Sequence, residues 1–316
     1  MLAKSLHKPN PECRPFNSIY VANNLDRNTL VSAMNIGAEL AKPIDTFIKK
    51  VSSGIGEWYK PTGIVRTAKA EAKAQLIMAT SDIMVTEVQR RAAERLRLEE
   101  TTKQINMETI AQNAIPFLSN ETKPELVEDD WIAKFFDKCR LTSDGEMQTI
   151  WSKILAGQAN CPGSFSKRTI DIVSNLEQKD AKAFEIACSF VVLINEKPTL
   201  LFFEPARTLY PFNLTSIMMH LASVGLVQQH PVSLVTAYSG EELNAIYFDT
   251  TLHVSLRYPD LNYLPVGTAA LTVSGEELYR VANPIRIYGF AQYVIEKWAT
   301  GEYVTSCSLR VTENQV

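Results

Sequence analysis

The sequence predicts a mainly α-helical protein with three parts. These are a long helical N-terminal half, a compact helical middle and a small α/β winged-helix-like module at the C-terminus. Two observations lead to this prediction. Residues 64–113 contain neither proline nor glycine and are rich in strong helix formers. Short alternating stretches typical of strands begin only near residue 199.

Changes of composition along the chain divide it into four regions. They are an irregular start with an amphipathic helix (1–60), a long helix or helical hairpin (61–118), a helical domain (119–197), and the winged-helix-like module with a C-terminal helix (198–316).

The first region has prolines near its start and an amphipathic pattern near its end. Its apolar residues recur at steps of three and four, which is typical of a helix with one apolar face: Ile44, Phe47, Ile48, Val51, Ile55 and Trp58. Lys49 and Lys50 lie beside this face, and we select them with Trp58 as candidate interaction residues. Packing into a bundle is the favoured interpretation, and membrane contact or a partner's groove are the alternatives.

Residues 64–113 would form a helix about 75 Å long if it were continuous. The stretch from Glu87 to Glu100 holds equal numbers of arginines and glutamates. The balanced charge favours a solvated or oligomerising face over a nucleic-acid surface. The candidate interaction residues are Arg90, Arg91, Arg95 and Arg97. We expect a homo-oligomer held through this helix; a hairpin that folds back near Ser81 and Asp82 is the alternative.

The third region has two short helices with apolar faces. Trp131, Phe135 and Phe136 share one face, and Trp151 stands on the face of a helix that starts near Glu146 and ends before Gly157. Further helices are predicted up to Leu176 and over 180–195.

In the fourth region the pattern predicts a helix over 214–223, a strand over 226–229 and a hairpin formed by 244–248 and 252–258. Ser274 and Glu277 have the spacing of a capping box at the start of another helix. A last helix over 288–299 precedes a weakly patterned tail.

No recognisable catalytic motif occurs, so we predict that the chain is not an enzyme and has no cofactor. Ser164 and Ser166 fit a turn and a helix cap better than a nucleophile, because no histidine lies near them in the sequence. Five cysteines without a close pair and four histidines predict neither a disulfide framework nor a metal site. The first 20 residues lack the apolar run of a signal peptide, so we expect a cytoplasmic protein.

Several motifs occur together and resemble a known family. They are Ser53-Gly-Ile-Gly-Glu57, Arg66-Thr-Ala-Lys-Ala-Glu-Ala72, Gln104-Ile-Asn-Met-Glu108, the block from Glu146 to Gly157, Pro162-Gly-Ser-Phe-Ser166 and Asp180-Ala-Lys-Ala-Phe184. This combination resembles an uncharacterised bacterial and phage-associated family catalogued as domain of unknown function 2806. Residues 151–181 are also similar to abortive-infection alpha proteins. These resemblances imply a place in phage–host conflict and transfer no catalytic residue.

The C-terminal pattern resembles a winged helix, a module that often reads DNA with one helix. Here the corresponding helix, 214–223, contains no lysine or arginine, although DNA binding depends on neutralising phosphates. We therefore expect a non-enzymatic interaction or oligomerisation protein, with a protein partner as a further option, and the family resemblance implies anti-phage defence or phage biology as its setting. The alternatives are a nucleic-acid-binding regulator that uses the basic N-terminal part and the winged module, and a membrane-associating abortive-infection effector.

Overall fold

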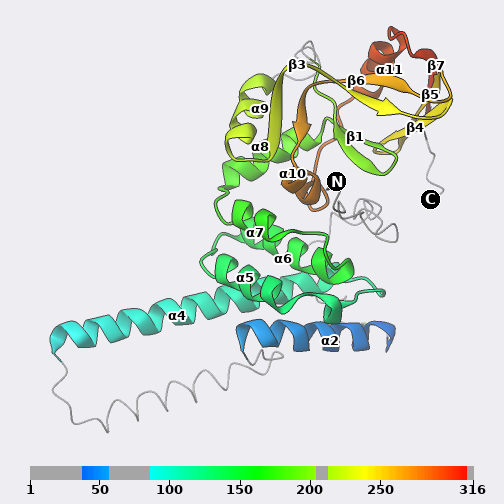
Figure 1. Ribbon diagram of the computed structural model, residues 1–316. Helices are drawn as coiled ribbons and strands as arrows, with labels where there is room; N and C mark the ends of the chain where they lie inside the picture. The colour runs from blue at the N-terminus through cyan, green and yellow to red at the C-terminus, as the bar shows by residue number, and fades with distance from the viewer. Residues whose placement is uncertain (1–37, 57–85, 204–212, 312–316) are drawn as a thin grey trace, which may run out of the picture. The chain divides into compact units, whose positions relative to one another are not determined.

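The computed structural model describes residues 38–56, 86–203 and 213–311. The described residues form two compact units that divide between Gly163 and Ser164 (Figure 1). In the first, the helical unit, the α-helices are α2 (Ala38–Ile55), α4 (Glu87–Ala114), α5 (Asp129–Cys139) and α6 (Gly145–Asn160), with short 3-10 turns at Ile115–Phe117 and Pro124–Leu126.

In the second, the α/β unit, the helices are α7 (Lys167–Val173), α8 (Gln178–Cys188), α9 (Leu214–Ser223), α10 (Val273–Tyr279) and α11 (Phe290–Ala299). Its strands are β1 (Val191–Ile194), β2 (Lys197–Leu200), β3 (Val227–Tyr238), β4 (Glu242–Tyr247), β5 (Thr250–Leu256), β6 (Asn262–Leu271) and β7 (Val304–Val311).

The predicted fold class, mainly helical with a small C-terminal module, is wrong. The α/β unit contains two antiparallel sheets, one of five strands in the order β2-β1-β4-β5-β7 and one in which β3 pairs with β6. The expected succession of helix, glycine and return strand is present as α9, Gly225 and β3. However, β3 has 12 residues, and the larger sheet makes the unit far more than a small winged-helix-like module.

Strands β1 and β7 were not predicted. The helix predicted over 180–195 ends at Cys188, and the β-branched run that follows forms β1. Asn195 and Glu196 both have positive φ, as a two-residue hairpin turn of type I′ requires, so the chain reverses directly into β2. The tail expected to be weakly patterned forms β7, which pairs with β5 along its length.

Two other predictions for this region are confirmed. The helix over 214–223 is α9, and the predicted hairpin is the β4–β5 pair. The core of the unit includes Phe190, Tyr247 and Phe290, whose ring centroids lie 5.1–5.2 Å apart in the pairs that contact. The Tyr247 hydroxyl donates to the Ser189 carbonyl, and burial raises the pKa of Tyr247 to about 12.

The capping box predicted at Ser274 and Glu277 is wrong. The N-cap of α10 is Thr272, two residues before Ser274, and its side chain accepts the hydrogen bond from the Gly275 N–H. The Glu277 carboxylate instead accepts hydrogen bonds from the Ser166 N–H at 2.7 Å and from the Thr169 hydroxyl. Glu277 therefore fixes α10 to the start of α7.

In the helical unit, α2 has the amphipathic pattern expected from the sequence. Its residues Phe47, Val51 and Ile55 are buried, and α2 packs against α5, α4 and the turn at Pro124–Leu126. The apolar face that the membrane hypothesis requires is thus covered by protein in this structure. In the part of the chain that the structure describes, no helix is both long enough and apolar enough to cross a membrane.

Of the two alternatives predicted for residues 64–113, the single uninterrupted helix is excluded. Helix α4 begins at Glu87, because Thr86 has a non-helical ψ of 154° and forms a capping box with Gln89. The proposed hairpin position at Ser81 and Asp82 lies outside the described residues.

The crossing of α2 and α5 depends on Gly54. A Cβ atom at this position would lie 2.5 Å from Ile132 Cγ2 and 3.0 Å from Phe136 Cδ2. We expect Gly54→Ala to lower the free energy of unfolding by about 1–3 kcal/mol, since overpacking outweighs the better helix propensity of alanine. Urea unfolding measures this change. Gly145→Ala is the control, because nothing lies within 4 Å of its Cβ. Equal stability of the two variants would show that α2 does not pack here.

Candidate interaction surface

The N-terminal end of α4 extends beyond the rest of the helical unit (Figure 1). Every residue from Glu87 to Leu98 is exposed, and Asn106 is the first buried residue of the helix. We call residues 87–105 the α4 end. A helix of this length has little stability alone, so local interactions must hold it.

Those interactions are a capping box and a series of ion pairs within the helix. The pairs are Glu87–Arg90 at 2.9 Å, Glu94–Arg97 at 3.0 Å, Arg95–Glu99 at 2.8 Å and Glu100–Lys103 at 2.6 Å, with a longer Glu87–Arg91 contact of 3.9 Å. The hydrogen bond from Arg90 lowers the pKa of Glu87. Apart from the half-buried Lys103, these side chains are solvent-exposed. Each pair contributes little alone, but together they favour the helical conformation.

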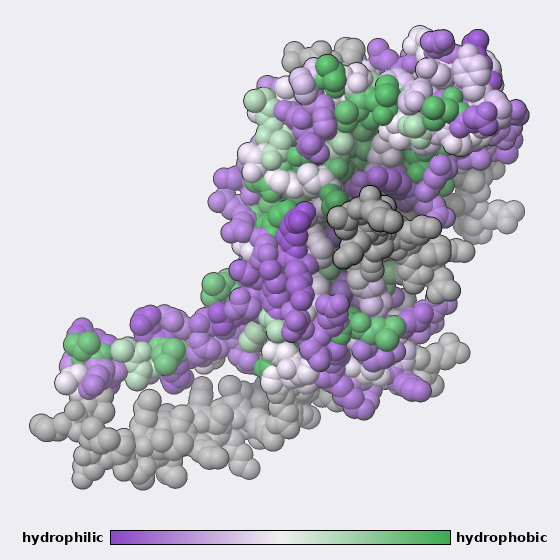
Figure 2. Space-filling model, viewed as in Figure 1, coloured by the Kyte–Doolittle hydropathy of each residue, from purple (hydrophilic) through white to green (hydrophobic). Residues whose placement is uncertain are grey.

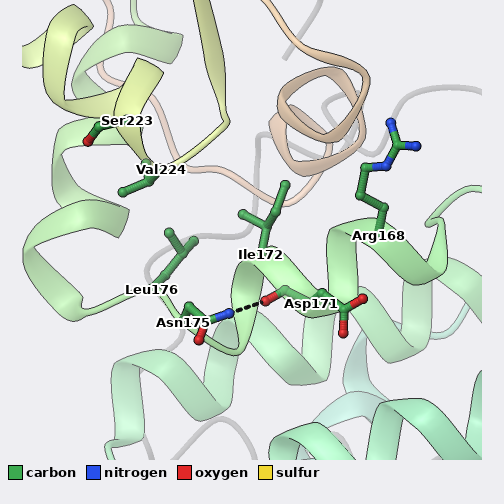
Figure 3. Close-up of a pocket in the computed structure, with 7 residues that line it drawn as sticks. All are labelled: Arg168, Asp171, Ile172, Asn175, Leu176, Ser223 and Val224. Atoms are coloured by element: carbon green, nitrogen blue, oxygen red, sulfur yellow. Dashed lines mark hydrogen bonds between the residues drawn. The ribbon is translucent and has the colours of Figure 1, made fainter.

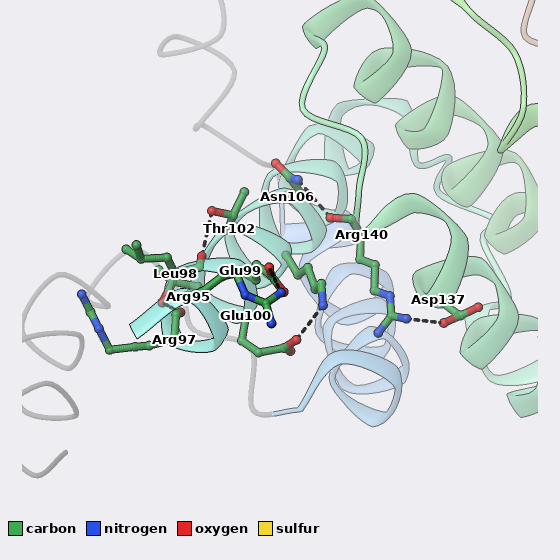
Figure 4. Close-up of polar contacts among 11 residues, drawn as sticks. Arg95, Arg97, Leu98, Glu99, Glu100, Thr102, Asn106, Asp137 and Arg140 are labelled. Atoms are coloured by element: carbon green, nitrogen blue, oxygen red, sulfur yellow. Dashed lines mark hydrogen bonds and ion pairs between the residues drawn. The ribbon is translucent and has the colours of Figure 1, made fainter. Parts of the chain in front are cut away.

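The C-terminal half of α4 is anchored by buried polar groups. The Asn106 side chain donates to the Arg140 carbonyl at 2.9 Å (Figure 4). It also donates to the Ser143 hydroxyl at 3.2 Å. The buried Ser152 hydroxyl donates to the Ile110 carbonyl. These contacts hold the helix where it enters the core, so the α4 end projects from a fixed base.

The sequence predicted some of this surface and missed the rest. Arg90, Arg91, Arg95 and Arg97 all lie on the α4 end, as paired side chains. The apolar residues exposed there were not singled out as a set: Val88, Leu96, Leu98 and Ile105 are between 52% and 66% exposed. Figure 2 shows hydrophobic residues set among hydrophilic ones along this end of the helix. The four-residue steps from Val88 to Ala92 and Leu96 are the signal that could have revealed one apolar line.

The other candidate residues are not brought to the α4 end. Lys49 lies on α2 and pairs with Asp45 at 2.7 Å. Lys50 also lies on α2, is 17% exposed and pairs with Asp129 on α5 at 2.6 Å. Trp58 lies outside the described residues.

The α/β unit has a shallow hollow between α7 and α9, with a volume of about 390 Å³. Its lining combines Arg168, Asp171 and Asn175 with apolar side chains, and Figure 3 shows the Asn175 amide bonded to the Asp171 carbonyl. Nothing in this lining pairs a nucleophile with a base. Ser166 caps α7, and Ser164 is buried.

A histidine and a carboxylate meet elsewhere in the α/β unit. Asp180 is buried and lies 2.7 Å from His220 Nε2. Burial raises the pKa of Asp180, but hydrogen bonds from the Glu177 N–H and from His220 outweigh it, so the pKa is lowered overall. The pair joins α8 to α9. Within the described residues, no cluster of three or more histidine, cysteine, aspartate or glutamate side chains could hold a metal ion.

Residues 90–294, about two thirds of the chain, match the model of a family described as "Protein of unknown function (DUF2806)". The chain belongs to this family. The resemblance drawn from the motifs is thereby confirmed. The DUF2806 match starts in α4 at Arg90 and ends in α11, so it includes most of the α4 end and does not include α2. Among curated proteins and solved structures, none matches the chain.

Proposed function

We propose that this protein is a non-enzymatic interaction protein that self-associates through the α4 end. The observation that supports this is an exposed helix carrying Val88, Leu96, Leu98 and Ile105 outside the core. Exposed apolar residues gathered on one projecting element are typical of protein–protein contact sites.

The charge of the α4 end favours a second copy as the partner. Residues 87–97 hold four arginines and two glutamates, whereas residues 98–105 hold two glutamates and one lysine. The first stretch is therefore net positive and the second net negative. Two copies arranged antiparallel place the basic stretch of each beside the acidic stretch of the other. Such a contact is self-complementary and closes as a dimer with two-fold symmetry.

Light scattering over a concentration series tests this proposal. We expect a mass above 35.4 kDa that falls on dilution. Leu96→Gln removes an apolar contact from an exposed position, so folding is retained and the dimer dissociation constant rises about tenfold. Leu141→Gln is the matched control, because Leu141 is also exposed in the helical unit but lies outside α4. A mass of 35.4 kDa at every concentration would exclude self-association.

Charge reversal tests the antiparallel arrangement separately. Arg90→Glu with Arg91→Glu should weaken the dimer, most strongly at low salt. Adding Glu99→Arg and Glu100→Arg to the same chain should restore it, because the two stretches have then exchanged signs. Failure of this restoration, with Leu96→Gln still weakening the dimer, would point to a parallel arrangement.

The biological setting that we propose, anti-phage defence or phage biology, is supported by the motif resemblance alone. A plaque assay with the wild-type protein and Leu96→Gln addresses it. If self-association serves defence, cells that carry the wild-type protein should form fewer plaques, and cells that carry Leu96→Gln should lose this protection.

A further inference from the structure

Strand β3 of the α/β unit forms one edge of the β3–β6 sheet, and its side chains carry no charge. Among the described residues, β3 pairs with β6 on one side and with no strand on the other. The pairing is irregular between Gln229 and Leu234 and again between Leu234 and Val235, so Val235–Tyr238 is the regular part of this edge. The chain has no charged residue from Thr208 to Gly240. Edge strands usually carry charges that prevent further pairing, and this edge lacks them.

The backbone groups that face this edge can be identified from the register. Val235 stands opposite Pro265, which has no N–H to donate, and the Pro265 carbonyl accepts from Trp298 Nε1 at 3.0 Å. Val235 and Pro265 therefore form a pair without mutual hydrogen bonds. In such a pair the N–H and C=O groups point away from the partner strand. By the two-residue alternation, the groups of Val235 and Ala237 both point to the open edge.

The side chains beside this edge form an apolar surface. Val235, Tyr263, Tyr258 and Leu261 are between 37% and 57% exposed. The Tyr303 ring contacts the rings of Tyr258 and Tyr263, with centroids 6.0 and 5.4 Å away. Figure 2 shows hydrophobic surface in the region where Figure 1 places β3 and β6.

Three acidic residues lie in the same loops as the tyrosines or in loops next to them. Glu241, Asp260 and Glu302 are exposed, and the loops that carry them are tied to the tyrosine loops by backbone hydrogen bonds such as Gly240 N–H to Pro259. The basic residue in these loops is Arg257. The tyrosine end of the edge is thus net negative.

From these observations we infer that the β3 edge binds an extended segment of a partner protein as an added strand. The segment exchanges hydrogen bonds with Val235 and Ala237, and its alternate side chains are apolar where they meet Val235 and Tyr263. A lysine or arginine at its end lies near the acidic residues and the tyrosine rings.

A synthetic peptide of alternating valine and threonine with a lysine at each end tests this inference by fluorescence polarisation. We expect saturable binding to the full chain. The same peptide with alternate backbone nitrogens methylated should bind at least about tenfold more weakly, because it cannot donate along one edge. A peptide with glutamate at each end should also bind more weakly at low salt. Equal binding of the methylated peptide, or no binding of either, would overturn strand addition.

Val235→Pro is the matching protein variant. Proline is tolerated on edge strands, and the Val235 N–H has no partner in β6, so the variant should fold. We expect loss of peptide binding with an unchanged thermal melt. If this variant fails to fold, the methylated peptide still decides the question. A lower solution mass for Val235→Pro than for wild type would assign the edge to a second copy and overturn the partner peptide.

Discussion

Gly267→Ala is expected to unfold the α/β unit or to destabilise it by roughly 4 kcal/mol or more. Gly267 has a φ of 101°, which alanine adopts only at a cost. An added Cβ atom would also lie 1.8 Å from the Phe202 carbonyl oxygen. That carbonyl accepts from the Thr268 N–H, and the Phe202 N–H donates to Val266. Relief of the collision must therefore break the hydrogen bonds that hold Phe202 against β6.

Gly225→Ala is the matched control for this prediction. Gly225 has a similar φ of 84°, but the nearest atom to its added Cβ is Ile172 Cδ1 at 3.7 Å. This variant should lose about 1–2 kcal/mol from backbone strain alone. The difference between the two variants in chemical denaturation measures the collision. Similar losses of stability in the two variants would mean that the Phe202 carbonyl does not lie against β6 at Gly267.

Trp151→Ala should destabilise the helical unit by about 3–5 kcal/mol, the cost of a large cavity in a packed core. Trp151 is 0% exposed, and its ring makes an edge-on contact with Phe135 at 5.2 Å. Phe135 in turn stacks on Trp131 at 5.1 Å, so the variant removes one member of an aromatic cluster.

Urea unfolding followed by circular dichroism measures the effect. Leu141→Ala serves as the control, since Leu141 is exposed in the same unit and should change stability by less than about 0.5 kcal/mol. A Trp151→Ala protein as stable as this control would contradict the burial of Trp151.

The sequence by itself determined the elements whose stability is local or whose apolar pattern is regular. Trp131, Phe135 and Trp151 could be assigned to the core because their spacing places them on single helix faces. Alternation over 244–258 was enough to predict the β4–β5 hairpin. The arginines of the α4 end were also found from the sequence, because ion pairs at three- and four-residue spacing are local.

Tertiary structure decided what local patterns cannot encode. Strand β7 lies on a sheet edge with few buried side chains, and its pairing with β5 brings together residues far apart in the chain. Glu277 has the spacing of a capping residue, yet its carboxylate is used by α7, more than a hundred residues away in the chain. The collision that excludes a side chain at position 267 comes from the carbonyl of Phe202, which is far from Gly267 in the sequence. Only the fold places these groups together, because contacts between distant segments depend on the packing of whole elements.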